Sequence, residues 1–277
     1  MKSLTPVLLV LLAAACQPLT LDPFLYDPLP APAAGYQLST AVIPAHEDLF
    51  VETPDGERLH LAFVPRAPAA QSAAPAGAAL VYFHGQSNNI GTAWPRAELL
   101  YPLGYPIYMV DPRGYGRSTG KPSEAGIVTD LQAVAKFLTE QRGMVPGQLI
   151  IYGYSLGGAF AIHLATLAPP GKLIIESTFT SVAALVADGA YAPLPVSFVA
   201  DSRWDSLAKI KTITSPLLLF HGTDDQYVQF RYGEELVAAH PGSHRFVPVP
   251  GANHTGVPDT LGHESYRAQI TAFLAGP

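Results

Sequence analysis

The residues with the clearest chemical potential are the five from 153 to 157, Gly-Tyr-Ser-Leu-Gly, with Ser155 at their centre. An apolar run over 149–152 precedes them and a run of small residues over 158–162 follows, which predicts a strand, a sharp turn and a helix. A serine on such a turn projects its hydroxyl clear of the sheet, and the N-terminus of the following helix can hold a developing negative charge. The context predicts a nucleophilic serine rather than an ordinary glycine-rich turn.

A serine hydroxyl is a poor nucleophile until a base takes its proton and a carboxylate orients that base. Where a serine lies on a strand–turn–helix of this kind, called a nucleophile elbow, the carboxylate and the histidine follow it in that order along the chain. Downstream, an apolar run over 217–220 leads into His-Gly-Thr-Asp-Asp, and we predict Asp225 as the carboxylate. Asp224 is the neighbouring candidate, and Glu176, at the end of another apolar run, is a third. One of the two aspartates is expected to cap the next helix.

The base has to be chosen among nine histidines. We predict His254, because it lies in a loop directly after the last apolar run, 245–249, and can reach the same sheet edge as Ser155. Four of the others precede the acid or lie within predicted elements: His46, His60, His84 and His163. His221 lies at the end of a strand, His240 and His244 flank the turn before the last strand, and His263 lies near the start of the terminal helix.

A developing oxyanion needs two N–H donors. The first is expected from Leu156, directly after the nucleophile. The second is expected from the loop after the run 79–83, where Gly85 lets the backbone approach a substrate and the N–H of Gln86 is the predicted donor. His84 is expected to pack beneath this loop.

The elements that must position these groups alternate between buried strands and helices, which predicts an α/β fold with a mostly parallel sheet covered on both faces. An Asp-Gly pair at 55–56 predicts an N-terminal β-hairpin. The longest segment between consecutive strands, 177–213, predicts a small cap whose apolar residues either line an acyl site or pack within the cap. The predicted strands of the sheet are 79–83, 106–110, 149–152, 172–175, 216–220 and 245–249, and the predicted helices include 127–141, 232–239 and 264–274.

Composition narrows the function further. The chain has 277 residues and a net charge of −6, with no lysine- or arginine-rich stripe, which argues against nucleic acid as a partner. It has one cysteine, and its histidines lack the spacing of a zinc motif, so we expect no metal site and no cofactor.

The N-terminus predicts export. Residues 1–15 combine a positive start, an apolar stretch and small residues, as in a secretory signal peptide. The small residues before Cys16 resemble the lipobox of bacterial lipoproteins, which implies lipidation of Cys16 and a protein anchored to a membrane surface facing the periplasm or the cell exterior. Gln17, directly after the cysteine, resembles the residue found at that position in lipoproteins sorted to an outer membrane. Ala13 departs from the lipobox pattern, so plain cleavage after Ala15 is the alternative. The proline-rich residues 16–41 are expected to form a tether, either a disordered spacer or a docked arm, before a domain over 42–277.

Together the motifs resemble the α/β-hydrolase family, over about residue 51 to the C-terminus. They are the loop at 83–85, Asp-Pro-Arg-Gly-Tyr-Gly-Arg-Ser at 111–118, the elbow, Glu-Ser-Thr-Phe-Thr-Ser at 176–181 and the segment 221–225. The pattern looks most like the branch with eukaryotic protein depalmitoylases and many bacterial hydrolases. The resemblance implies hydrolysis of a small-molecule ester or acylated substrate by Ser155, Asp225 and His254, and structural roles for Arg113 and Arg117. A peptidase of the prolyl oligopeptidase type and an inactive tethered binding module are the alternatives.

Overall fold

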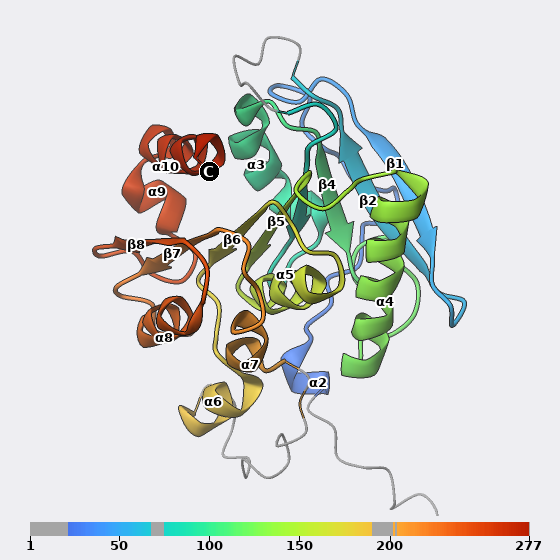
Figure 1. The fold of residues 1–277 in the computed structure, drawn as a ribbon. Coiled ribbons are helices and arrows are strands. Elements are labelled where there is room, and N and C mark those ends of the chain that lie inside the picture. The colour runs from blue at the N-terminus through green and yellow to red at the C-terminus, as the bar shows by residue number, and fades with distance from the viewer. Residues whose placement is uncertain (1–21, 68–74, 190–201, 203, 277) are drawn as a thin grey trace, which may run out of the picture.

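One eight-stranded sheet runs through the molecule in the order β1-β2-β4-β3-β5-β6-β7-β8 (Figure 1). The structure, a computed structural model, describes residues 22–67, 75–189, 202 and 204–276; the predicted signal peptide and Cys16 lie outside them. The β1–β2 and β2–β4 pairs are antiparallel and all other pairs are parallel, which confirms the predicted mostly parallel sheet. The strands are β1 (Glu47–Glu52), β2 (Arg58–Val64), β3 (Ala79–Phe83), β4 (Ile107–Asp111), β5 (Leu149–Tyr154), β6 (Lys172–Glu176), β7 (Leu217–Gly222) and β8 (His244–Val249).

The central strands are apolar runs because both faces of the sheet are covered. Every residue of β3, β4 and β5 is buried, as expected for parallel strands with helices on both sides. The hairpin β1–β2 closes through hydrogen bonds between Thr53 and Glu57, and Gly56 supplies the positive φ of +87° that the turn requires.

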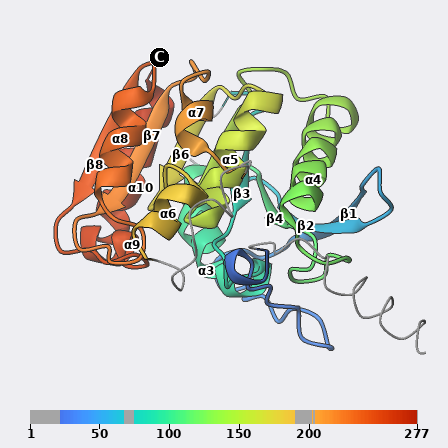
Figure 2. The same ribbon diagram turned by 90° about the horizontal axis from the view of Figure 1, so that it is seen from below.

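Helices cover the two faces in separate layers (Figures 1 and 2). One layer contains α4 (Glu124–Lys136), which continues as the π-helix η2 (Phe137–Gln141), together with α5 (Leu156–Leu167), α7 (Ser206–Ile210) and α8 (Arg231–Ala239). The other contains α3 (Ile90–Leu100), the 3-10 turn η1 (Tyr101–Leu103), α9 (Val257–Leu261) and α10 (His263–Ala275). Within the described residues, no helix is both long enough and apolar enough to cross a membrane.

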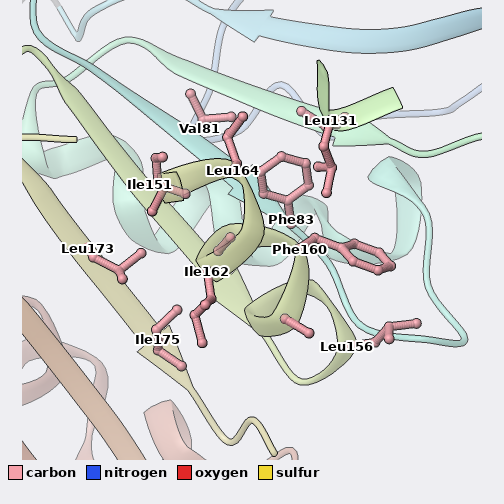
Figure 3. Packing of buried hydrophobic residues seen from close by; sticks show 14 of the residues in the cluster. Val81, Phe83, Leu131, Ile151, Leu156, Phe160, Ile162, Leu164, Leu173 and Ile175 are labelled. Atoms are coloured by element: carbon pink, nitrogen blue, oxygen red, sulfur yellow. The ribbon is translucent and has the colours of Figure 1, made fainter. Parts of the chain in front are cut away.

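Helix α5 lies at the centre of its layer and is apolar on almost every side. Figure 3 shows Leu164 of this helix beside Val81 of the sheet and Phe160 beside Phe83. A helix that is buried all round has no polar face to keep in water, which explains the sequence of small and apolar residues after the elbow. The start of α5, and with it Ser155, is therefore fixed against the sheet.

The segment between β6 and β7 is the one predicted to form a small cap. Its described part contains α6 (Val182–Ala187) and α7, with Leu185 and Trp204 buried. Trp204 packs its ring 5.0 Å from that of Phe160, so this residue belongs to the core. The predicted apolar cap residues at 191, 194, 196, 198 and 199 lie outside the described part of the chain.

Part of the proline-rich N-terminal segment is docked on the domain. It begins with the short helix α2 (Asp22–Leu25), and both Leu25 and Tyr26 are buried in the core that α5 shares with the sheet. Further along, the Tyr36 hydroxyl donates to Oδ2 of Asp111 (2.6 Å). Of the two arrangements expected for this segment, the docked arm is the one found for its described residues, and the packed core begins before residue 42.

Candidate active site

Ser155 lies on the sharp turn between β5 and α5. Its φ of 54° and ψ of −122° place a non-glycine residue in a strained region of the backbone. The conformation is held from both sides, because the Ser155 N–H donates to the carbonyl of Glu176 (2.9 Å) and the Ser155 carbonyl accepts from Thr178 Oγ1 (2.7 Å). The neighbouring glycine is obligatory: a Cβ on Gly157 would lie 2.3 Å from the carbonyl oxygen of Phe83.

His254 connects the serine to a carboxylate. Its Nε2 atom lies 2.9 Å from Oγ of Ser155, and its Nδ1 atom lies 2.7 Å from Oδ2 of Asp225. An ionised carboxylate only accepts hydrogen bonds, so we assign the ring proton to Nδ1, which leaves Nε2 as the acceptor for the serine hydroxyl. The structure thus brings together the three side chains that the sequence selected from far-apart positions.

Asp225 is buried and supplied with donors. Its Oδ1 atom accepts from the backbone N–H groups of Tyr227 (3.0 Å) and Val228 (2.8 Å). Burial would raise the pKa of Asp225, but hydrogen bonds from His221, His254 and Val228 lower that pKa to about 2. The carboxylate is therefore ionised at neutral pH and available to orient His254.

The other acids considered from the sequence lie elsewhere. Asp224 is exposed, and its Oδ1 atom accepts from the hydroxyl of Thr223 (2.9 Å). Glu176 is fully buried and forms a bidentate ion pair with Arg96, with both N–O distances 2.8 Å. Neither carboxylate is hydrogen-bonded to His254.

The two residues predicted to supply the oxyanion donors line one cavity. Gln86 and Leu156 line it together with Ser155, and within the described residues no acceptor takes up the backbone N–H of either. Leu156 is the first residue of α5, so its N–H also lies at the positive end of the helix dipole. The arrangement can stabilise negative charge beside the Ser155 hydroxyl.

The loop that carries Gln86 is supported from beneath. Nδ1 of His84 lies 2.8 Å from the carbonyl of Gly85, and its Nε2 lies 3.3 Å from Oδ1 of Asp111, an ion-pair distance. Oδ1 of Asp111 also accepts from the N–H of Ile90 (2.8 Å), the first residue of α3. His84 thus packs below the loop as predicted. The part played by Asp111 was not predicted, although it opens the motif 111–118.

Arg113 and Arg117 tie loops together, in the structural role expected for them. Arg113 donates to both Asp55 and Asp130, and Arg117 is paired with Asp48. These partners join the motif 111–118 to the N-terminal hairpin and to α4.

The cavity above Ser155 has a volume of about 380 Å³, a size that fits a small organic ligand. No Asp, Glu, Lys or Arg is found among its described lining residues. Its apolar side is formed by Leu25, Leu156, Phe179, Leu185, Tyr227 and Val228. Leu25 was not predicted here, since nothing in a proline-rich composition indicates what such a segment packs against.

The part of the chain that the structure describes holds no cluster of three or more His, Cys, Asp or Glu side chains arranged to bind a metal ion. The chemistry of the site can be derived from the serine, the imidazole, the carboxylate and the backbone donors.

Comparison with known proteins places this site in a family. Residues 74–204 match the family described as Serine aminopeptidase, S33. The chain is 35% identical to Uncharacterized protein Rv2307c of Mycobacterium tuberculosis over 247 residues, which are 88% of this chain and 84% of that protein. It is 29% identical to Alpha/beta hydrolase domain-containing protein aho-3 of Caenorhabditis elegans over 199 residues, which are 70% of this chain and 57% of that protein.

Solved structures share the fold. The esterase Pf2001 of Pyrococcus furiosus superposes with a TM-score of 0.67 at 21% identity, covering 90% of this chain and 98% of the esterase. Acetyl xylan esterase 1 of Thermoanaerobacterium sp. JW/SL YS485 gives a TM-score of 0.67 at 18% identity, with 87% of each chain covered. The sequence relatives and the common fold agree, and the chain belongs to the α/β-hydrolase family.

Proposed function

We propose that this hydrolase cleaves carboxylic ester or thioester bonds through an acyl-enzyme on Ser155. The observation that carries the proposal is the hydrogen-bonded line Ser155–His254–Asp225 beside a cavity that Ser155, His254, Gln86 and Leu156 all line. The esterases among the structural neighbours support an ester bond as the target.

Acylation begins when Oγ of Ser155 attacks the carbonyl carbon and Nε2 of His254 takes the serine proton. The resulting tetrahedral oxyanion accepts from the N–H groups of Leu156 and Gln86, and loss of one such donor typically costs about 3 kcal/mol of transition-state stabilisation. Asp225 stabilises the imidazolium that forms. The intermediate collapses as His254 passes its proton to the departing alcohol or thiol.

Deacylation repeats these steps with water. His254 takes a proton from the water as its oxygen attacks the acyl carbon, and then returns that proton to Oγ of Ser155 when the ester bond to the enzyme breaks. The products of this half-reaction are a carboxylic acid and the free serine, and water is the one reactant it consumes.

The cavity favours a neutral acyl group. Its apolar side accepts hydrocarbon, and a charged substituent would find no partner among the described lining residues. This feature also separates the proposal from a serine aminopeptidase, the activity in the matched family's description. An aminopeptidase has to bind a free α-ammonium group, for which a carboxylate is the natural partner. Turnover of aminoacyl amides but not of esters would reverse this choice.

Covalent labelling tests the proposal and excludes the alternative of an inactive binding module. The folded protein should react with a fluorophosphonate probe and hydrolyse p-nitrophenyl esters. Ser155→Ala should abolish labelling and lower kcat by about 10⁴-fold or more, since the remaining donors and binding provide only residual catalysis. Ser215→Ala removes a hydroxyl that donates to the carbonyl of Pro170 just before β6 and β7 begin, at the opposite ends of the parallel strands from Ser155. It is the matched control and should label fully. A folded wild-type protein that neither labels nor turns over esters overturns the proposal.

We also propose that Cys16 is lipidated and anchors the exported protein to a membrane surface, on the lipobox-like sequence that precedes it. The protein made in a bacterium that processes lipoproteins should partition into detergent, and Cys16→Ser should move it to the aqueous phase. Equal partition of both into the aqueous phase would exclude the anchor and leave plain cleavage after Ala15.

A further inference from the structure

The docked N-terminal arm, here residues 22–31, lies against the loop that carries the predicted oxyanion donor. The side-chain Nε2 of Gln86 donates to the carbonyl of Phe24 (2.9 Å), and Oγ of Ser87 donates to Oδ2 of Asp27 (2.8 Å). The arm is thus bonded to Gln86, the residue that lines the cavity and is predicted to supply an oxyanion donor.

The arm is held along its whole length. At its start, Oδ1 of Asp22 accepts from the N–H of Glu124 at the beginning of α4 (3.1 Å). In the middle, the buried hydroxyl of Tyr26 accepts from Nε1 of Trp204 (2.7 Å). At its end, the N–H of Ala31 donates to the carbonyl of Gly116 (2.8 Å) and the N–H of Gly116 donates to the carbonyl of Leu29 (2.9 Å), so Pro30 and Gly116 form a parallel β-bridge. Segments separated by up to 178 positions therefore fix its place.

Asn89 ties the arm to the helix behind the loop. Its side-chain oxygen caps α3 by accepting from Thr92 N–H (3.0 Å), while its Nδ2 donates to the carbonyls of Leu29 (3.1 Å) and Pro30 (3.3 Å). One side chain thus satisfies backbone groups of both segments, so the loop 85–89 and the arm cannot shift independently.

Within this fixed arm, Leu25 presents its side chain to the cavity above Ser155. Only 4% of the residue is exposed, and it belongs to the same apolar cluster as Leu156, Phe179, Leu185 and Val228, which line the cavity with it. The other four apolar groups come from α5, the β6–β7 segment and the β7–α8 loop. Leu25 is the residue that the N-terminal arm contributes to the apolar wall of the cavity.

We propose that Leu25 is a specificity-determining residue that limits the length and bulk of the acyl group accepted by Ser155. The inference rests on the proposed esterase function. The wall is rigid because the arm is bonded at its start, middle and end, so a change in side-chain volume at position 25 changes the space available to the substrate. Each methylene that gains or loses apolar contact is worth about a fourfold change in binding, by the transfer free energy of a CH₂ group.

The test compares kcat/KM for p-nitrophenyl esters from acetate to decanoate. Leu25→Ala truncates the side chain to Cβ and should raise the ratio of kcat/KM for long over short esters by about tenfold or more. Leu25→Phe should lower the same ratio. Leu29→Ala is the matched control, because this leucine lies on the same arm, is 39% exposed and does not line the cavity; its ratio should equal that of the wild type.

A ratio within one variant depends only on its folded molecules, so partial unfolding of a core variant leaves the readout intact. Should Leu25→Ala fail to fold, Leu25→Val carries the same expectation with a smaller shift. Ratios for the Leu25 variants that match the wild type, in an enzyme that labels and hydrolyses esters, overturn the role of Leu25 alone. A wild-type protein without esterase activity or labelling overturns the proposed function itself.

Discussion

Nε2 of His221 lies 3.4 Å from Oδ2 of Asp225, the same oxygen that bonds to His254. The same nitrogen lies 2.8 Å from the carbonyl of Val228, and because both neighbours are acceptors, Nε2 must carry the ring proton. Nδ1 of His221 is buried and has no hydrogen-bond partner in the described part of the chain. This histidine therefore holds both the acid and the turn that supplies its backbone donors.

Replacing His221 with phenylalanine should weaken the orientation of Asp225 without removing it. We expect kcat to fall about tenfold with little change in KM, because one donor to a charged group is lost while the N–H groups of Tyr227 and Val228 remain. Steady-state kinetics with a p-nitrophenyl ester measure the effect. His244→Ala, an exposed histidine on β8, is the control; equal rates for both variants and the wild type would contradict the prediction.

The choice between the adjacent aspartates can be tested directly. Asp225→Asn should lower kcat by about 10³–10⁴-fold, because an amide in place of the carboxylate favours the wrong tautomer of His254. Asp224→Asn should stay within about twofold of the wild type, since an exposed side chain that is not hydrogen-bonded to His254 contributes little. The reverse order of effects would assign the acid to Asp224.

Stability should fall in acid partly through Asp111. Burial would raise the pKa of this carboxyl, but His60, His84 and Tyr36 around it lower the pKa to about 2, against about 3.9 in the unfolded chain. The unfolded state therefore binds more protons between about pH 4 and pH 2, so the stabilisation is complete above this window and is lost as the pH falls through it. The contribution amounts to about 2.5 kcal/mol.

Urea unfolding across this window measures the contribution of Asp111. The wild type should lose more free energy of unfolding between about pH 4 and pH 2 than Asp111→Asn, which cannot titrate at this position. Parallel pH curves for the two proteins would show that the environment of Asp111 does not lower its pKa.

The buried pair of Arg96 and Glu176 predicts a large loss of stability when one partner is removed. Arg96→Met should cost about 3–5 kcal/mol in urea unfolding, because Glu176 is left as an uncompensated buried charge whose remaining side-chain donors among the described residues are Tyr152 and Tyr266. Combining it with Glu176→Gln should restore part of the loss. A double variant as unstable as the sum of the two single variants would argue against the pairing.

Much of the fold was predictable because its strands are buried on both faces and their apolar runs are continuous. β3 begins and ends where the sequence indicates, and the other parallel strands differ by a residue or two at their ends. The elbow was predictable because its sequence pattern follows from close packing: Gly153 and Gly157 are needed where backbones approach closely. His254 followed from chain order alone.

Features that depend on tertiary packing were not predictable. Helix α3 contains Pro95, which sequence rules treat as a helix breaker, and its start is defined by the capping box of Asn89. The distinction between Asp224 and Asp225 depends on which side chain the turn directs inward. The position of Leu25 depends on a surface assembled from segments distant in the sequence.

With Cys16 lipidated as proposed, the position of α2 would limit the distance between the opening of the active-site cavity and a bilayer. Cys16 precedes Asp22 by only six positions, which even a fully extended chain can stretch to no more than about 20 Å. With acyl chains on Cys16 as proposed, this short segment would keep the opening above Ser155 close to the lipid headgroups. A free proline-rich spacer reaching to residue 41 would have allowed a much larger distance between the domain and the membrane. Docking of the arm therefore shortens the part of the tether that would be free to extend.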